Sequence, residues 1–204
     1  MEFRDAVAAR HSAYMLDGDL SKAGVTVEDV VERLREIAPA VPSSFNSQSV
    51  RMIVLTGDDH RALWGIVEDV LRAKVGDDAR FKSTEVKVRN FAKAAGTVLF
   101  YEIDALTDGL IEKYPTYASS FPVWAEHGNA MMQYAVWLAL FDMGLGANIQ
   151  HYNPIIDSRV AETFDVPQGY RLVAQIVFGG IAGEAARKDK QPGDVLVAVG
   201  HAKE

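Results

Sequence analysis

The sequence predicts a domain in which helices and strands share a hydrophobic core. The chain has 204 residues and 49% of them are hydrophobic, which is enough to bury one sizeable core or two halves that share one. Several segments repeat apolar residues at helical spacing, whereas three shorter apolar runs have the length and composition of buried strands. We therefore expect a single domain that covers residues 1–204.

The first predicted helix covers residues 3–10 and is followed by a polar cluster. Arg10, His11 and Ser12 bring a guanidinium, an imidazole and a hydroxyl together. This trio suits a phosphate group, because arginine can bind phosphate oxygens through two nitrogens. A solvated helix end is the alternative interpretation, since the helix dipole favours cations at that end. The residues alone leave both interpretations open.

A loop over residues 13–25 leads to a second predicted helix, and a polar segment follows that helix. The helix carries acidic residues in its first turn and ends at Pro39 and Pro42. Residues 42–48, with the sequence PSSFNSQ, then supply five uncharged side chains that both donate and accept hydrogen bonds. They suit the edge of a heteroaromatic ligand, but proline, serine and asparagine are also the usual residues of a plain turn.

The middle of the chain alternates predicted strands and helices. Residues 50–55 and 96–102 are apolar runs typical of buried strands, and they are separated by helical segments. The second of those segments, residues 76–95, carries several cations that include Lys87. A run of cations of this kind is usually a solvated helix face. A short helix over residues 104–113 follows the second strand.

The longest predicted helix runs from residue 121 to residue 143, and its second half is apolar on all sides. We therefore expect this half to be buried on most sides, as in a core helix, and a helix at a subunit interface would look the same. Glycines at 144 and 146 then permit a tight turn and a close approach of the backbone to a ligand. A helix over residues 157–164 and a strand over residues 172–178 complete this part.

The C-terminal tail contains a basic patch at residues 187–190 and an apolar run at residues 195–199. The apolar run is predicted to be a strand. A terminal strand needs a sheet edge, which can belong to its own chain or to a partner's.

Charge and composition argue against several classes of function. The formal net charge of -7 disfavours a broad surface for nucleic acid or for an anionic membrane. The longest fully apolar run, residues 134–141, is too short to span a bilayer, and the first residues lack a signal-peptide core, so we expect a soluble cytoplasmic protein. The chain has no cysteine, and its five histidines form no metal-binding pair. Hydrolase motifs are also missing, so an added cofactor would carry any chemistry.

Five segments, taken in order, resemble the nitroreductase family of flavin enzymes. They are ARHS at residues 9–12, PSSFNSQ at 42–48, GTVLFYE at 96–102, FPVW at 121–124 and GLGANIQHYNP at 144–154. The resemblance is closest to the short subgroup that includes the yeast fatty-acid-repression-mutant protein and bacterial members of similar length. The ordered set spans nearly the whole chain, which makes the resemblance specific.

The resemblance implies an α+β fold with a mostly antiparallel central sheet flanked by helices. It implies a homodimer with two FMN sites at the interface, and a C-terminal strand, here residues 195–199, that joins the partner's sheet. It implies no metal ion and no catalytic side chain, because the flavin moves the electrons.

The resemblance also assigns residues to the FMN site. Arg10, His11 and Ser12 would hold the phosphate and the ribityl chain, and Lys188 and Lys190 would form a basic pair on the phosphate. The flavin ring would meet polar residues of the loop at 42–48, which come from the other subunit: Ser43, Ser44, Asn46 and Gln48. It would also meet a backbone N–H that reaches flavin N5, in the segment that contains Asn148, Ile149 and Gln150.

Further residues are expected around the flavin ring and the substrate. Lys87 would lie near the pyrimidine edge, where a cation stabilises the anionic reduced flavin. The residues expected in the substrate pocket are Phe45, Phe121, Trp124 and His151. Tyr14 stands where many larger members of the family carry a lysine, so a contact to a nicotinamide phosphate is not implied.

The resemblance leaves more than one function open. The first is an FMN-dependent oxidoreductase that uses NADH or NADPH to reduce nitroaromatics, quinones or both by a ping-pong mechanism. The alternative is a flavin-binding regulatory or stress-response protein, linked to lipid signalling, with incidental reductase activity. Relatives that fragment flavin or dehalogenate tyrosines form a third class.

Overall fold

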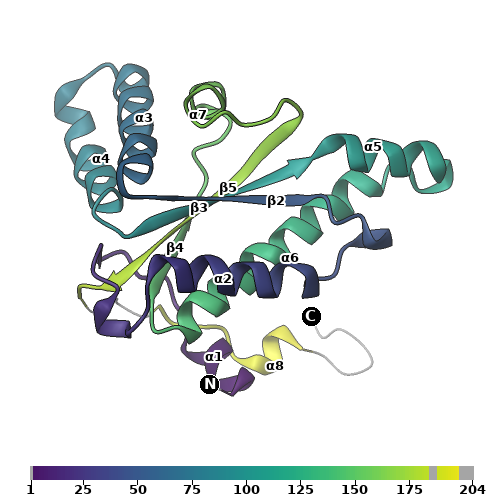
Figure 1. Cartoon of the computed structure of the whole chain (residues 1–204), viewed down its shortest axis with the longest axis horizontal. Helices are drawn as coiled ribbons and strands as arrows, with labels where there is room; N and C mark the ends of the chain where they lie inside the picture. The colour runs from purple at the N-terminus through teal and green to yellow at the C-terminus, as the bar shows by residue number, and fades with distance from the viewer. Residues whose placement is uncertain (1, 184–187, 198–204) are drawn as a thin grey trace.

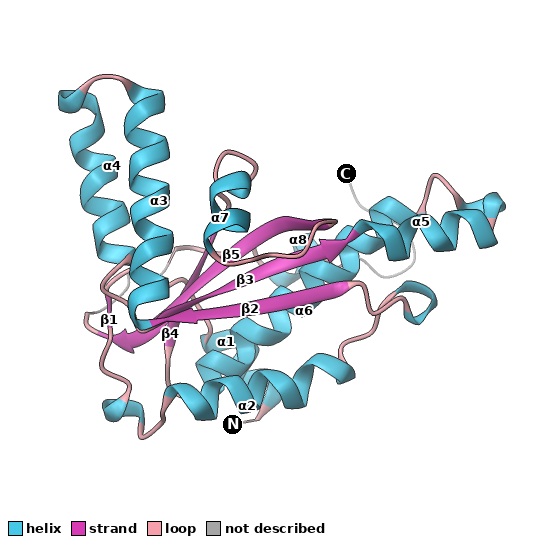
Figure 2. Ribbon diagram, turned by 45° about the horizontal axis from the view of Figure 1, so that its top comes forward, coloured by secondary structure: helices cyan, strands magenta, loops and turns pink. Residues whose placement is uncertain are grey.

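A five-stranded antiparallel sheet forms the centre of the protein (Figures 1 and 2). The structure is a computed structural model that describes residues 2–183 and 188–197. The strands are β1 (Leu16–Asp17), β2 (Val50–Thr56), β3 (Gly96–Ile103), β4 (Gly146–Gln150) and β5 (Tyr170–Ile181). β5 is the central strand, because it pairs with β3 on one edge, with β4 on the other and with β1 at its end. β2 pairs with the outer edge of β3.

Helices cover both faces of this sheet. They are α1 (Phe3–Ala9), α2 (Val27–Ile37), α3 (Gly57–Val75), α4 (Asp78–Phe91), α5 (Asp104–Lys113), α6 (Phe121–Asp142), α7 (Asp157–Thr163) and α8 (Gly193–Leu196). The α3–α4 pair and α7 lie on one side of the sheet, and α2 and α6 lie on the other (Figure 1). This arrangement confirms the predicted α+β fold with an antiparallel sheet flanked by helices.

The side chains of β3 fill both cores, because successive residues of a strand point to opposite faces. Val98 and Phe100 join the cluster under α2 and α6. Leu99 and Tyr101 join the cluster under α3 and α7. A strand buried on both faces has no polar alternation, which explains why the apolar run was predicted correctly as a core strand.

Helix α6 is buried along one stripe only, which differs from the prediction for its second half. Met132, Val136 and Leu140 recur at helical spacing and are buried against the sheet. Met131 and Tyr134 lie elsewhere on the helix and are 42% and 41% exposed. An apolar helix therefore leaves part of its surface uncovered in a single chain.

The segment after α6 forms an edge strand in addition to the predicted turn. Gly144 has a φ of +79°, which suits the tight turn. Gly146 begins β4, and a Cβ at that position would lie 2.5 Å from Leu16 Cδ2. The second glycine thus permits a close approach of two parts of the chain. Neither β1 nor β4 was predicted from the sequence.

The prediction of a strand at residues 195–199 is wrong for its first residues. Helix α8 covers Gly193–Leu196, and residues 198–199 lie outside the described part of the chain. A short apolar run cannot be assigned to helix or strand by periodicity alone, and Val195 falls in such a run. Strand exchange with a partner stays a prediction. Within the described ranges, no helix is both long and apolar enough to cross a membrane.

Candidate functional site

The polar cluster after α1 and the basic pair near the C-terminus line one cavity. Its volume is about 270 Å³, and its lining includes Arg10, His11, Ser12, Lys188 and Lys190. The first three residues follow the end of α1, whereas the two lysines lie almost 180 residues later in the sequence. Folding thus brings together all five residues that were predicted to hold a phosphate. Tyr14 lines the same cavity.

Arg10 is held by aromatic rings of α6 and retains unused hydrogen-bond donors. Its guanidinium carbon lies 4.3 Å from the centroid of the Trp137 ring and 6.0 Å from that of Tyr134. The Nε and Nη1 atoms are buried and have no hydrogen-bond partner among the described residues. Burying a donor without a partner costs about 1–3 kcal/mol. An anion in this cavity would remove that cost, so the donor set fits a phosphate.

His11 is oriented by the backbone of α1. Its Nδ1 lies 2.9 Å from the Ala9 carbonyl oxygen, which can only accept a hydrogen bond, so Nδ1 carries a proton. Among the described residues the other ring nitrogen, Nε2, has no hydrogen-bond partner, so it can bind a ligand or water. The His11 ring also meets Phe141 of α6 edge-on at a centroid distance of 6.5 Å.

The loop at residues 42–48 has a constrained backbone. Phe45, Asn46 and Gln48 have φ values of +54°, +52° and +47°, a region that residues other than glycine rarely occupy. Hydrogen bonds within the loop support this shape: the Gln48 N–H donates to Ser43 Oγ at 3.0 Å, and Gln48 Nε2 donates to Asn46 Oδ1 at 3.0 Å. Strained residues of this kind cluster at ligand-binding sites, which favours the functional interpretation of the loop over a plain turn.

The loop borders a cavity beside α6. Ser43 and Gln48 line it together with Gly128 and Met132 of α6, and its volume is about 370 Å³. A Cβ at Gly128 would come within 3.8 Å of the Ser43 side chain, so this loop packs closely on the helix. Ser44 and Asn46 belong to the same loop, in a 3-10 turn that covers Ser44–Asn46.

Three residues of the predicted substrate pocket form an aromatic cluster. Phe45 lies 5.2 Å from Phe121 and stacks on Trp124 at 6.2 Å, measured between ring centroids. Tyr114 and Tyr117 join the cluster at 4.9 Å and 6.0 Å from Phe45. These two tyrosines were not among the predicted pocket residues, although both lie a few residues before the FPVW segment. Phe45 is 49% exposed, so the cluster has an open side.

His151 does not join that cluster. It follows the end of β4 and is exposed at the start of the connection to α7. Lys87 is likewise exposed, on α4, with its Nζ 5.6 Å from the Phe91 ring centroid. Neither residue lines the cavities described above, and their predicted roles stay predictions.

The backbone of β4 presents hydrogen-bonding groups away from β5. The Ala147 carbonyl accepts from the Ala13 N–H at 2.9 Å, so residue 147 points its backbone groups to the outer edge. Residues two apart on a strand share an edge, and the Ile149 N–H therefore points the same way. Asn148 Nδ2 donates to the Ala13 carbonyl and Gln150 Nε2 donates to Asn148 Oδ1, both at 2.8 Å, which fixes this edge.

The cavity after α1 and the aromatic cluster contact different parts of α6. Arg10 packs on Trp137, whereas the aromatic cluster includes Trp124. Thirteen residues of helix correspond to roughly 20 Å at 1.5 Å per residue. A single chain thus places the two halves of the predicted site well apart along one helix.

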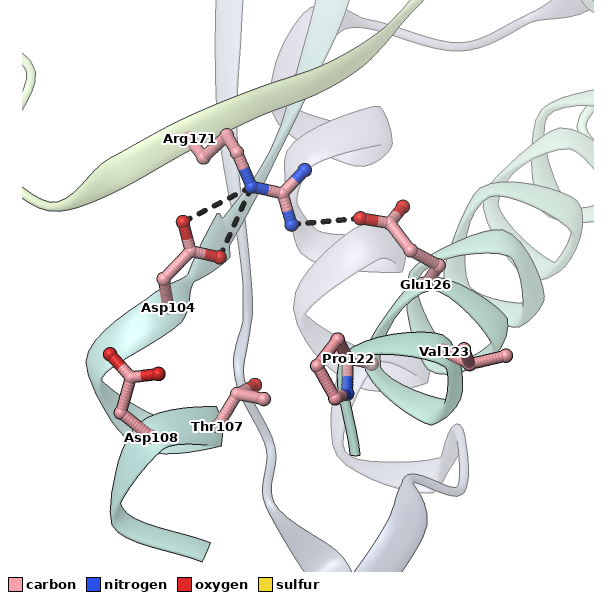
Figure 3. Close-up of a pocket in the computed structure, with 8 residues that line it drawn as sticks. Asp104, Thr107, Asp108, Pro122, Val123, Glu126 and Arg171 are labelled. Atoms are coloured by element: carbon pink, nitrogen blue, oxygen red, sulfur yellow. Dashed lines mark hydrogen bonds and ion pairs between the residues drawn. The ribbon is translucent and has the colours of Figure 1, made fainter. Parts of the chain in front are cut away.

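A further cavity of about 580 Å³ lies between α5 and α6 and is lined by charged residues (Figure 3). Arg171 Nε donates to both carboxylate oxygens of Asp104 at 3.1 Å, and its Nη2 donates to Glu126 at 2.8 Å. The arginine thereby ties the start of β5 to both helices. The charge of Arg171 is therefore balanced by two of the carboxylates that line this cavity.

Comparisons with known proteins identify the family. The sequence model of the nitroreductase family matches residues 19–180. The Saccharomyces cerevisiae nitroreductase FRM2 is 32% identical over 177 residues, which are 87% of this chain and 86% of FRM2. This chain belongs to the nitroreductase family. Family membership gives it a general oxidoreductase role and confirms the resemblance seen in the sequence.

Solved structures agree with this assignment. The nitroreductase CinD from Lactococcus lactis, in complex with nicotinic acid, is 36% identical with a TM-score of 0.89 over 98% of this chain and 100% of CinD. CinD has also been solved with chloramphenicol and with 4-nitrophenol. A nitroreductase-like protein from Exiguobacterium sibiricum, in complex with FMN, has a TM-score of 0.70 over 98% of this chain and 97% of its own. At 16% sequence identity, this structural similarity shows that the two proteins share a fold.

Proposed function

We propose that the chain is an FMN-dependent oxidoreductase that uses NADH or NADPH to reduce nitroaromatic compounds or quinones. One observation carries the cofactor assignment: Arg10 has buried donors without partners in a cavity that also contains Lys188 and Lys190. The FMN in the structural relative from Exiguobacterium sibiricum supports the same cofactor, and the 4-nitrophenol in CinD supports a nitroaromatic substrate.

The cavity after α1 would hold the FMN phosphate. The Arg10 donors, Ser12 and the two lysines would bind phosphate oxygens. Arg10 and the two lysines carry three positive charges, which exceed the roughly two negative charges of a phosphate monoester. The outer edge of β4 would supply the Ile149 N–H to the flavin ring, with Asn148 and Gln150 holding that edge in place. When bound, FMN supplies the redox chemistry by accepting electrons from the nicotinamide and passing them to the oxidant in a ping-pong scheme.

A homodimer would complete the site. The loop that carries Ser43, Ser44, Asn46 and Gln48 packs on α6 at Gly128, about 14 Å along the helix from Trp137, and a second copy would bring these residues to the flavin. The exposed Met131 and Tyr134 give α6 an apolar surface suitable for this contact. The aromatic cluster of Phe45, Phe121 and Trp124 would then cover the open face of the flavin and receive a planar substrate.

A simple experiment tests this function. The purified full-length protein should be yellow from bound FMN, and its visible absorbance should bleach when NADH or NADPH is added without oxygen. Adding 4-nitrophenol or a quinone should restore the colour and give steady-state turnover. A colourless protein that takes up no added FMN would contradict the proposal, whereas a stable FMN complex that neither nicotinamide reduces would favour the regulatory alternative.

A further inference from the structure

An aromatic stripe on α6 contacts two of the residues that line the cavity after α1, Arg10 and His11. Tyr134, Trp137 and Phe141 are spaced i, i+3 and i+7, which places them on one face of the helix. Arg10 lies over the first two rings, and His11 meets the third edge-on. No sequence motif pointed to these residues, because aromatic residues at helical spacing are ordinarily core.

The way in which Arg10 is held differs from that of other arginines in the chain. Arg171 is fixed by the carboxylates of Asp104 and Glu126, and Arg89 is fixed by Glu68 and Glu85. Such partners occupy the guanidinium donors and neutralise the charge. Among the described residues, Arg10 has no carboxylate partner, and the Trp137 ring lies 4.3 Å from its guanidinium carbon.

An aromatic ring can fix a cation without using its hydrogen-bond donors. The attraction comes from the negative face of the ring, so the N–H groups at the guanidinium edge stay available. The Nε and Nη1 atoms of Arg10 are in that condition: they are buried and unpartnered. Tryptophan gives the strongest attraction of this kind among the aromatic residues.

We propose that Trp137 is a positioning residue that holds the Arg10 guanidinium for an incoming phosphate monoester. Trp137 acts through Arg10 and does not itself need to touch the ligand. The identification of the ligand as FMN rests on the proposed function, but the role of Trp137 toward a phosphate group does not.

The first test compares FMN with riboflavin, which lacks the phosphate. In the full-length chain, Trp137→Leu should raise the Kd for FMN about three- to tenfold and leave the Kd for riboflavin within about twofold. Trp137→Phe keeps an aromatic face and should recover most of the FMN affinity. Tyr134→Leu is the matched control on the same helix face: it keeps an apolar side chain for the proposed dimer contact, and it should have a smaller effect because its ring lies 6.0 Å away. Equal losses for FMN and riboflavin would show a merely structural role and overturn the inference.

A double-mutant cycle separates positioning from direct binding. In an Arg10→Ala background, Trp137→Leu should cause no further loss of FMN affinity, since the group that it positions is gone. Losses that add would mean that Trp137 acts independently of Arg10, which would also overturn the inference.

Inorganic phosphate allows the same test without flavin. Phosphate should raise the melting temperature of the wild-type chain by mass action, and the rise should shrink by half or more in Trp137→Leu and in Arg10→Ala, while Trp137→Phe should keep most of it. A wild-type chain that binds phosphate in this way but not FMN would refute the proposed function and uphold the inference. A phosphate-induced rise that is the same in all these proteins would refute the inference, whatever the flavin does.

Discussion

At the scale of single residues, we predict that Arg10 contributes strongly to phosphate binding in the cavity after α1. Arg10→Ala removes two buried donors, so FMN binding should weaken by roughly 1.5–3 kcal/mol, as for a lost hydrogen bond between charged groups. Riboflavin binding should change much less. Calorimetric titration of the full-length protein with both flavins measures the difference, and Lys188→Ala should behave in the same way. Identical losses with the two flavins would show that these side chains do not contact the phosphate.

His60 is buried in the core beneath α3, and we expect it to affect the stability of the fold. It is 1% exposed, and its ring nitrogens lie 3.0 Å from Thr97 Oγ1 and 3.0 Å from the Phe91 carbonyl. The carbonyl can only accept, so Nε2 carries the proton and Nδ1 accepts from the Thr97 hydroxyl, which in turn accepts from Trp64 Nε1. Burial lowers the pKa of His60 to about 4 from an ordinary 6.5, because the charged ring would lose its water.

This lowered pKa gives a pH-dependent stability with a defined sign. Between pH 6.5 and 4 the unfolded chain protonates His60 and the folded chain does not, so the free energy of unfolding falls as the pH falls. The loss should approach roughly 3 kcal/mol at pH 4, from about 1.4 kcal/mol per pKa unit. Chemical denaturation across this range measures it. His60→Gln cannot titrate and should flatten the slope, and an unaltered slope would assign the effect to other groups.

At the scale of elements, the strain in the loop at residues 42–48 can be tested by comparing the stabilities of two variants at Phe45. A protein with alanine inside a helix or strand is normally more stable than the same protein with glycine there, by about 0.5–1 kcal/mol, because glycine has more freedom in the unfolded chain. At Phe45 the φ of +54° reverses the argument, since a Cβ is unfavourable there. Phe45→Gly should therefore be more stable to denaturant than Phe45→Ala by roughly 1 kcal/mol. Both variants lack the ring, so its packing cancels, and a more stable alanine variant would mean that the loop is not strained.

The elements differ in how far their sequences reveal them. β3 could be predicted, because its short apolar run is rich in β-branched and aromatic residues and begins at a glycine, features that favour a buried strand. β4 could not, because its sequence GANIQ alternates weakly and its strand character depends on pairing with β5. The strain in the loop at residues 42–48 was also hidden, since Phe45 and Gln48 are not residues that signal a positive φ.

At the scale of the whole molecule, many of the predicted site residues fall into two groups, one around the cavity after α1 and one around the loop at residues 42–48. The sequence order of Arg10 and Lys188 says nothing of their distance, and only the family resemblance joined them before the fold did. The aromatic stripe of Trp137 was missed because a tryptophan in an apolar helix is ordinarily interpreted as core. In the proposed dimer a second chain would join the loop residues to the cavity after α1, and neither a sequence pattern nor one folded copy would display that contact.

The exposed apolar residues of α6 lead to a prediction about assembly. Met131 is 42% exposed on the helix that contacts both halves of the candidate site. Met131→Glu would place a charge in the proposed interface, where burying it without a partner is unfavourable. The variant should shift the protein from dimer to monomer in analytical ultracentrifugation and should lose FMN affinity together with the dimer. Val86→Glu on α4 is the matched control, because Val86 is 56% exposed on a helix outside the proposed contact. A Met131→Glu protein that stays dimeric with unchanged FMN affinity would place the interface elsewhere, and a wild-type chain that sediments as a monomer with bound FMN would show that one copy completes the site.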